Sequence, residues 1–366
     1  MLIETESAPG NPATTLSTLP PATEPAAPPP MRVLMVSDAW HPQVNGVVRT
    51  LATVAEELER VGDVVEVIGP DRFATIPMPS YPEIRLALFP GAPLARMVDD
   101  FAPEAVHIAT EGPLGWAMRG ICLKRGWPFT TSFHTKFPDY LHARTRLPPR
   151  YAWGVLRRFH EAGQGTFAAT ASLRAELAGQ GFTKIVAWTR GVDLGLFRPA
   201  PDRESLWPGL PRPIFLYAGR VAVEKNIEAF LALDLPGSKV VVGDGPQRAA
   251  LQRRFPEAHF AGWRQGQGLA EAYAGADVMV FPSRTDTFGL VLLESMACGT
   301  PVAAFPVTGP RDVVAPGTGA LDEDLRVAAL AALGADRGAC RAHAETYAWD
   351  SCAAAFRQRL VLIPAA

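Results

Sequence analysis

The sequence predicts an α/β protein built from two Rossmann-like domains, each a doubly wound and mostly parallel sheet. From residue 31 onward, short apolar runs of strand length alternate with amphipathic segments of helical period. The alternation starts afresh after residues 198–213, where five prolines are typical of a linker. A chain of 366 residues is also long enough for two separate hydrophobic cores.

The N-terminal domain is predicted over residues 31–197. Its first strand is the apolar run at 32–36, and a helix at about 47–61 follows because apolar residues recur there at helical spacing. The remaining strands are predicted at 64–68, 105–109, 128–133, 166–170 and 184–188. Helices fit between most of these strands, as a doubly wound sheet requires.

The C-terminal domain is predicted over residues 214–340. Its strands are predicted at 214–219, 239–245, 258–262, 277–283 and 301–305. Residues 341–366 are predicted to form a C-terminal helix that packs back toward the N-terminal domain. Because open α/β sheets bind ligands beyond the carboxyl ends of their strands, we expect a ligand cleft between the domains, with function carried by the loops after strands.

The composition argues against several classes of protein. Residues 1–30 contain eight prolines and neither Lys nor Arg, which predicts a disordered Pro-rich tail rather than a secretory signal. No apolar run reaches about 18 residues, so no membrane span is predicted. A net charge of −2 gives no bias toward nucleic acid. The four scattered cysteines favour a reducing cytoplasm over a disulfide framework or a zinc knuckle.

Two cations flank the loop that follows the first strand of the C-terminal domain. In AGRVAVEKN, residues 218–226, Arg220 and Lys225 lie just ahead of a predicted helix. A guanidinium binds two phosphate oxygens at once and an ammonium adds a mobile point charge, so the pair suits a diphosphate in a cleft. A pair of solvated surface cations is the alternative interpretation, and the position after a strand favours the phosphate site.

A glycine-rich turn, VGDGP at 242–246, follows the next predicted strand and includes Gly243 and Gly245. Such a turn lets backbone approach a ligand closely, although any tight strand–helix turn can use one. It is not a P-loop, because no G-K-[ST] follows, and it lacks the full G-x-G-x-x-G pattern of a conventional NAD site.

Two carboxylates, Asp286 and Glu294, bracket the apolar run in SRTDTFGLVLLESMACGTPVAA, residues 283–304. A helix that starts near Phe288 would direct its first N–H groups at an anion. Eight helical residues rise about 12 Å, whereas the two acids of a glycosidase stand about 5–9.5 Å apart. The spacing therefore favours two contacts on one long ligand over an acid–base pair. A capping Asp and a surface Glu are the alternative.

The order of these motifs resembles the retaining glycosyltransferases of family 4, which have the GT-B fold. The resemblance rests on the carboxylate, seven residues, then Glu, followed by A-x-G-x-P-V at 297–302, and on NGVVRT (45–50), ATEGPLG (109–115) and SFHT (132–135). It covers roughly residues 31–360. The TDTFG stretch is similar to that of bacterial GDP-mannose-dependent α-mannosyltransferases and sulfoquinovosyl-diacylglycerol synthases. Asp286 stands where many family members have Glu.

The resemblance implies roles for individual residues. Arg220 and Lys225 would hold the donor diphosphate, Glu294 the ribose hydroxyls and Asp286 the donor sugar. His134 would lie beside the transferred sugar, although a lone histidine in a strand loop is more often structural. Further donor contacts are implied for the N-terminal loop, the glycine-rich turn and the start of the α-helix, namely Asn45, Gly46, Val47, Gly243, Gly245, Phe288, Gly289 and Leu290.

The implied reaction is transfer of a hexose, with mannose favoured, from a GDP- or UDP-linked sugar with retention of configuration. No metal and no cofactor are expected, because cations and helix amides can stabilise the leaving group. The DED run at 322–324 is interpreted as the solvated surface of a helix. A nucleotide-sugar epimerase, a phosphorylase or a sugar-binding protein would share the same cleft, but a phosphorylase needs a pyridoxal-phosphate lysine that no motif indicates.

The acceptor is predicted to lie against the N-terminal domain. Residues 119–158 contain nine Lys or Arg, one acid and several aromatic residues, which suits peripheral contact with anionic lipid at the inner face of the cell membrane. A solvated basic face is the alternative. A membrane lipid is favoured as acceptor, with a soluble glycan as the other possibility. Glu111, Asp139 and Tyr140 are the candidate acceptor-binding residues.

Overall fold

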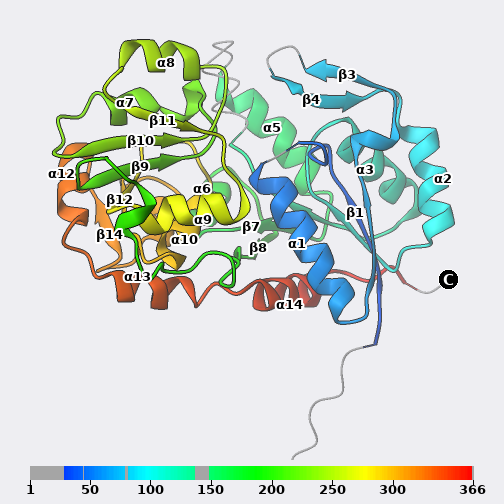
Figure 1. Cartoon of the computed structure of the whole chain (residues 1–366). Helices are drawn as coiled ribbons and strands as arrows, with labels where there is room; N and C mark the ends of the chain where they lie inside the picture. The colour runs from blue at the N-terminus through cyan, green and yellow to red at the C-terminus, as the bar shows by residue number, and fades with distance from the viewer. Residues whose placement is uncertain (1–28, 44, 79–80, 137–147, 365–366) are drawn as a thin grey trace, which may run out of the picture.

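The computed structural model describes residues 29–43, 45–78, 81–136 and 148–364. Figure 1 shows two α/β domains side by side, the N-terminal sheet on the right and the C-terminal sheet on the left. Each is a six-stranded parallel sheet with helices packed on it. The predicted fold class is therefore confirmed. The predicted tail at 1–30 lies almost entirely outside the described residues.

The N-terminal sheet has the order β2-β1-β5-β6-β7-β8. Strands β1 (Arg32–Val36) and β2 (Val64–Ile68) coincide with the predicted runs, since both are bounded by sharp changes in polarity. The other parallel strands are β5 (Ala105–Ile108), β6 (Thr130–Ser132), β7 (Gly165–Ala168) and β8 (Ile185–Ala187). The helices are α1 (Gly46–Arg60), α2 (Gly91–Phe101), α3 (Pro113–Arg125), α5 (Pro149–His160) and α6 (Ala171–Gly179).

An antiparallel hairpin of β3 (Thr75–Met78) and β4 (Tyr81–Ala87) was not predicted. Its residues pack little into the core, and Ile76 is 46% exposed. The apolar periodicity that identifies a buried strand is therefore missing from this part of the sequence.

The C-terminal sheet has the order β11-β10-β9-β12-β13-β14. Its strands are β9 (Ile214–Ala218), β10 (Ser238–Val242), β11 (His259–Gly262), β12 (Val278–Phe281), β13 (Val302–Ala304) and β14 (Gly319–Leu321). The short edge strand β14 escaped prediction. The helices on this sheet are α7 (Ile227–Leu231), α8 (Arg248–Arg254), α9 (Gly266–Gly275), α10 (Leu290–Ala297), α11 (Pro310–Val313) and α12 (Leu325–Ala332).

The C-terminal region forms two helices where one was predicted. Helix α13 (Arg337–Ala344) packs into the C-terminal domain through Cys340 and Ala344. The helical structure is interrupted near Tyr347, whose carbonyl accepts a hydrogen bond from the Val192 N–H at 2.9 Å. Helix α14 (Trp349–Arg359) then crosses to the N-terminal domain and packs on α1 (Figure 1). None of the described helices has the length and apolarity needed to cross a membrane.

Each sheet has one switch point, where the strand order reverses direction. In the N-terminal sheet it lies between β1 and β5, and in the C-terminal sheet between β9 and β12. The loops after these four strands diverge there and leave room for a ligand. The same loops carry Asn45, Glu111, Lys225 and Asp286, so the topology brings the predicted site residues to the places where a doubly wound fold binds ligands.

Candidate active site

Lys225 and Asp286 meet at the switch point of the C-terminal sheet. Lys225 follows β9, Asp286 follows β12, and the Lys225 Nζ lies 2.6 Å from Asp286 Oδ1. Their side chains are 23% and 19% exposed, so the pair is largely shielded from water. Lys225, the predicted diphosphate-binding residue, therefore forms an ion pair with Asp286, the predicted sugar-binding residue.

Arg220 lies on the same loop as Lys225. Its guanidinium is 3.9 Å from the Glu224 carboxylate, and its carbonyl accepts a hydrogen bond from the Tyr217 hydroxyl at 2.7 Å. The side chain is 37% exposed, more than that of Lys225. Arg220 is thus the more solvent-exposed of the two cations on this loop.

The glycine-rich turn serves packing in this structure. Gly243 has φ +143° and Gly245 has φ +154°. A Cβ added at Gly243 would lie 1.8 Å from the Gly219 carbonyl oxygen, and one at Gly245 would lie 2.4 Å from that of Val221. The two glycines are required because the turn lies directly against the loop that carries Arg220, which is a reason independent of their predicted donor contacts.

Helix α10 begins at Leu290, two residues later than the start predicted near Phe288. Gly289 has φ +85°, a left-handed conformation that favours glycine, and it forms the N-cap. The Phe288 side chain is 5% exposed and packs in the core, so only its backbone is suited to a donor contact. The free N–H groups at the start of α10 carry partial positive charge that favours an anion.

A second helix N-terminus meets α10 from the other domain. Asn45 is the N-cap of α1, and its Oδ1 accepts hydrogen bonds from the N–H groups of Val47 and Val48 at 3.0 Å. A Cβ on Gly46 would lie 3.5 Å from Leu290 Cδ1, which brings the first residues of both helices together. The positive ends of two helices from opposite domains therefore lie close to each other.

Glu294 is buried one turn into α10, and both of its oxygens have partners. Oε1 lies 2.5 Å from a guanidinium nitrogen of Arg49 in the opposite domain, and Oε2 accepts a hydrogen bond from the Tyr273 hydroxyl at 3.1 Å. Burial, and then the charge of Glu294, raise the pKa of Tyr273 well above its usual range, so this hydroxyl stays a donor. The sequence prediction assigned no role to Arg49 or Tyr273, although Arg49 lies within the NGVVRT motif.

His134 is held as a neutral imidazole with one nitrogen available. Its Nδ1 lies 3.0 Å from an Arg190 guanidinium nitrogen, and because arginine only donates, Nδ1 is an acceptor and the proton belongs on Nε2. Burial, and then the charge of Arg190, lower the pKa of His134 well below its usual range. Arg190, which the sequence prediction did not include, is buried against Trp188 and donates to the Thr189 carbonyl at 3.0 Å.

Three buried side-chain atoms lack a hydrogen-bond partner within the described part of the chain: His134 Nε2, Asp286 Oδ2 and Asp312 Oδ2. Two of them belong to predicted site residues on opposite domains. The Thr287 hydroxyl donates to the His134 carbonyl at 2.7 Å, which holds the loop of Asp286 against His134. Since buried polar atoms are rarely unpaired, a donor and an acceptor that lack partners here indicate a place for a polar ligand.

The predicted acceptor residue Glu111 follows β5, and a buried histidine holds its carboxylate in place. Its Oε1 lies 3.0 Å from Nε2 of the fully buried His160, whose Nδ1 lies 2.8 Å from the Thr131 hydroxyl. Asp139 and Tyr140, the other two candidates, lie outside the described residues. His160 was not predicted, because nothing in sequence spacing connects it with Glu111.

The Lys and Arg side chains of the basic stretch 119–158 differ in burial and in their partners. Lys136 is buried, pairs with Glu176 at 2.7 Å and donates across the cleft to the Thr308 hydroxyl at 3.2 Å. Arg125 pairs with Asp99 at 2.8 Å. The exposed part that the structure describes is centred on α5, where Tyr151, Val155 and Arg158 share one helical face.

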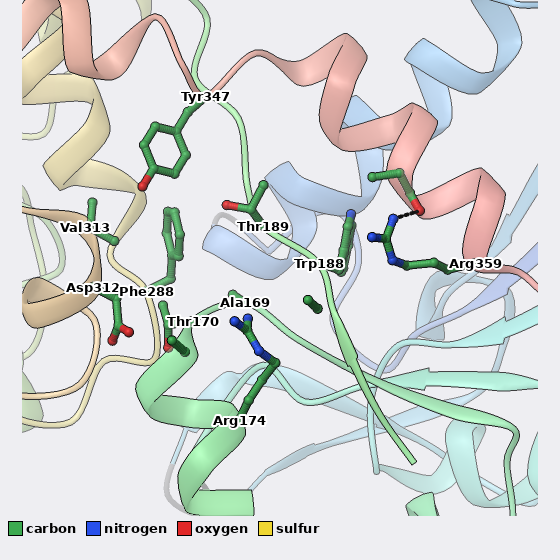
Figure 2. Close-up of a pocket in the computed structure, with 13 residues that line it drawn as sticks. Ala169, Thr170, Arg174, Trp188, Thr189, Phe288, Asp312, Val313, Tyr347 and Arg359 are labelled. Carbon is green, nitrogen blue, oxygen red and sulfur yellow. Dashed lines mark hydrogen bonds between the residues drawn. The ribbon is translucent and has the colours of Figure 1, made fainter.

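A pocket of about 360 Å³ lies between the domains, and Phe288 is among the residues that line it. Figure 2 shows it bounded by Thr170 and Trp188 from the N-terminal domain, by Phe288 and Asp312 from the C-terminal domain, and by Tyr347 from the connection to α14. The Thr170 hydroxyl donates to the Thr287 carbonyl at 3.3 Å. This pocket therefore adjoins the loop of Asp286 without containing its carboxylate.

The DED run does not lie in a helix, contrary to the prediction. It directly follows β14, where Asp324 caps α12 and Glu323 pairs with Arg284. The prediction failed because strand β14 was not recognised. Within the described residues, no group of three or more His, Cys, Asp or Glu side chains is arranged to hold a metal ion.

Two family models match the chain. Residues 44–196 match the model described as Glycosyltransferase Family 4, and residues 212–333 match the one described as Glycosyl transferases group 1. A GDP-mannose-dependent alpha-mannosyltransferase of Mycobacterium tuberculosis is 34% identical over 310 residues, which cover 78% of this chain and 82% of that protein.

Two further relatives are more distant. Sulfoquinovosyl transferase SQD2 of Arabidopsis thaliana is 29% identical over 78% of this chain and 61% of its own length. An alpha-monoglucosyldiacylglycerol synthase of Streptococcus pneumoniae is 26% identical over 75% of this chain and 71% of its own length.

Solved structures share the two-domain architecture. Sucrose-phosphate synthase from Thermosynechococcus elongatus superposes with a TM-score of 0.73 at 21% identity, covering 90% of this chain and 98% of that one. Anabaena HepE in complex with UDP-glucose gives 0.66 at 16% identity, covering 90% and 98%. These similarities show the fold, which is GT-B.

Proposed function

The chain belongs to glycosyltransferase family 4, and from this premise we propose that it transfers mannose from GDP-mannose to a membrane lipid, with retention of the α configuration. That it is a glycosyltransferase follows from the match over both domains and from relatives at about one-third identity. The donor sugar, its base, the stereochemistry and the acceptor are the parts of the proposal that need support from the site.

The donor diphosphate would bind where the N-termini of α1 and α10 converge. Leu290 and Gly46 present helix starts from opposite domains, and Lys225 and Arg220 supply full positive charges on the adjoining loop. Positive helix ends and cations fixed before the reaction stabilise the charge that develops on a departing nucleotide without any reorganisation at that moment. This arrangement needs no metal ion to neutralise the leaving group.

The sugar would lie between His134 and Asp286, and this is the observation that carries the proposal. The Nε2–H of His134 is a donor without a partner among the described residues, and Asp286 Oδ2 is an acceptor without one. A hydroxyl can accept from the first and another can donate to the second. A sugar held from both sides satisfies both groups and is fixed relative to the diphosphate.

The stereochemical proposal follows from what flanks the sugar. Asp286, the carboxylate that the proposal places beside the sugar, is paired with Lys225, and we assign it to binding rather than to attack on the anomeric carbon. We therefore propose front-face transfer, in which the acceptor hydroxyl approaches from the side of the leaving phosphate and its proton passes to that phosphate. The product keeps the α configuration of the donor.

GDP-mannose is the preferred donor because the relative with 34% identity bears that dependence in its name, and the TDTFG stretch is present here. A lipid acceptor is supported by the diacylglycerol product named for the more distant relative and by the exposed face of α5. Tyr151 and Val155 are each 54% exposed there, beside Arg158. An aromatic and apolar face with a cation suits the surface of an anionic membrane.

Incubation of the full chain with membrane lipid extract and either GDP-mannose or UDP-glucose tests the proposal. Mass spectrometry of the extracted lipids should show a hexose added only with GDP-mannose, and the anomeric proton–carbon coupling in NMR should identify an α-linkage. The variant Lys225→Met serves as the control for background transfer.

The outcomes separate the parts of the proposal. Hexose addition from UDP-glucose alone would contradict the donor, and a β-linked product would contradict retention. Transfer to a soluble glycan acceptor, with none to lipid, would contradict the lipid acceptor while leaving the donor site intact.

A further inference from the structure

One ion pair between the two domains involves Arg49, a residue to which the proposed reaction gives no role. Arg49, in the first turn of α1, binds Glu294 of α10 across the cleft, with 2.5 Å between the guanidinium nitrogen and Oε1. The two residues are 245 positions apart in the chain and belong to different domains. Glu294 is 3% exposed, whereas Arg49 is 44% exposed.

The two oxygens of Glu294 face different surroundings. Oε2 points into the core, where it accepts from the Tyr273 hydroxyl, and Tyr273 has 0% exposure. Oε1 points at the opposite domain, because its partner comes from α1. The oxygen that a ligand in the cleft can reach is thus the one that Arg49 occupies.

Arg49 and a ribose would compete for that oxygen. A buried carboxylate that loses its cation without a replacement is destabilised, and the effect is moderated here because Arg49 is partly exposed. Ribose hydroxyls donate hydrogen bonds to Glu294 but bring no positive charge. A ribose that takes the place of the guanidinium at Oε1 therefore deprives Glu294 of its cation, and the released Arg49 is expected to stay close to the anion that arrives with the ribose.

The proposed diphosphate position is within reach of the released side chain. Leu290, at the start of α10, precedes Glu294 by four residues, a rise of about 6 Å along the helix. Gly46 at the start of α1 already lies against Leu290, because a Cβ added to Gly46 would be 3.5 Å from Leu290 Cδ1. A rotation of the Arg49 side chain would carry its guanidinium from the ribose position toward the phosphates.

We propose that Arg49 is a donor-exchange residue, which occupies Glu294 in the donor-free enzyme and moves onto the diphosphate when the ribose displaces it. The proposal rests on the proposed function, since it assigns Glu294 to the ribose. In the free enzyme the pair joins the domains, and in the complex the donor does so. The exchange weakens the binding of a nucleoside, because its ribose must displace Arg49. A nucleoside diphosphate offsets this loss, because Arg49 then contacts its phosphates.

This difference gives a test with opposite signs. Titration calorimetry would measure guanosine and GDP binding to the wild type and to Arg49→Met, which keeps the aliphatic stem and removes the charge. Guanosine should bind the variant about fivefold more tightly, because its competitor is gone. GDP should bind about tenfold less tightly, because the phosphate contact is lost.

Two further variants act as controls. Arg49→Lys keeps a cation and should show both changes in reduced form. Thr308→Val removes the hydroxyl that Lys136 contacts across the cleft, a cross-domain contact away from Glu294, and should leave the ratio of the two affinities unchanged. Circular dichroism would establish that each variant is folded.

If guanosine binding by Arg49→Met is unchanged or weakened, or if GDP binding is unchanged, the exchange is wrong even though the proposed donor stands. A wild type that binds no GDP at all would overturn the proposed donor, and the exchange with it.

Discussion

One aspartate lies near each end of strand β12, and the two differ in how many of their carboxylate oxygens have partners. Asp277, at the amino end, has both oxygens occupied by Arg203 at 2.6 Å, Arg212 at 2.7 Å and the Ile214 N–H at 2.7 Å. Asp286, beyond the carboxyl end, has one oxygen on Lys225 and one without a partner among the described residues. At the amino edge of the sheet the aspartate is thus fully satisfied by protein groups, whereas at the carboxyl edge one buried oxygen of Asp286 has no partner in the described part of the chain.

Two histidines of the N-terminal domain, His107 and His134, differ in the same way in their hydrogen-bond partners. His107, within β5, has Thr130 at 2.8 Å on Nδ1 and Ser132 at 2.9 Å on Nε2. His134, just beyond β6, has Arg190 on one nitrogen and an unpartnered second nitrogen. Burial alone does not distinguish a structural polar group from a functional one. Under the proposed function, the unsatisfied atom of His134 at the carboxyl edge makes that distinction.

Replacing Lys225 gives the largest expected effect on the ligand-dependent edge. Lys225→Met should lower kcat/KM for the donor by about 10³-fold, equivalent to about 4 kcal/mol of transition-state stabilisation, because a preorganised charge at the leaving group is lost. Steady-state kinetics with GDP-mannose would measure it. A loss of less than tenfold would show that Lys225 is only the structural partner of Asp286.

Replacing Asp277 should have the opposite pattern. Asp277→Asn leaves Arg203 and Arg212 without their counter-charge and should lower the free energy of unfolding by about 3 kcal/mol, at the low end for a buried pair because both arginines are partly exposed. Urea denaturation would measure the change. The kcat/KM of the folded fraction should stay within twofold, and a drop like that of Lys225→Met would remove the distinction between the two edges.

His134 tests the unsatisfied nitrogen directly. His134→Phe keeps an aromatic ring beside Trp188 but removes the Nε2–H, and should lower kcat/KM by about 10²-fold. His134→Gln offers an amide N–H instead and should recover part of the loss. Equal activity of the two variants would indicate that ring packing, rather than the hydrogen bond, is what His134 contributes.

Acid should destabilise the protein through His107. Burial lowers the pKa of His107 from 6.5 to about 3, so below pH 6.5 the unfolded chain takes up a proton that the folded chain does not. Stability therefore falls as the pH drops, by about 2 kcal/mol between pH 7 and pH 5 from this group. Urea denaturation of the wild type should show this additional loss relative to His107→Leu, and equal losses in both proteins would contradict the assignment.

The smallest effect is expected at the exposed face of α5. Arg158→Gln should weaken binding to vesicles with anionic lipid by about 1 kcal/mol, or roughly fivefold, and leave binding to neutral vesicles unchanged. Vesicle sedimentation would measure both. If the variant binds anionic vesicles as the wild type does, the acceptor surface lies elsewhere.

The sequence was most informative where local pattern determines structure. Strands β1 and β2 match the predicted ranges to the residue, and the motifs single out Lys225, Asp286 and Glu294, for which the structure shows ion pairs with Asp286, Lys225 and Arg49. The β3–β4 hairpin and β14 lack a buried apolar pattern and were missed. Arg49, Arg190 and His160 were also missed, because each acts through a partner that is distant in sequence, and only the placement of sheets and domains brings the partners together.

A crystal structure of the enzyme with a non-transferable analogue, GDP-2-deoxy-2-fluoromannose, tests the central claim most directly. We predict that His134 Nε2 and Asp286 Oδ2 each lie within hydrogen-bond distance, about 2.7–3.2 Å, of a sugar hydroxyl, with the diphosphate at the start of α10. A complex in which the analogue is bound while both atoms remain without a partner would contradict the account.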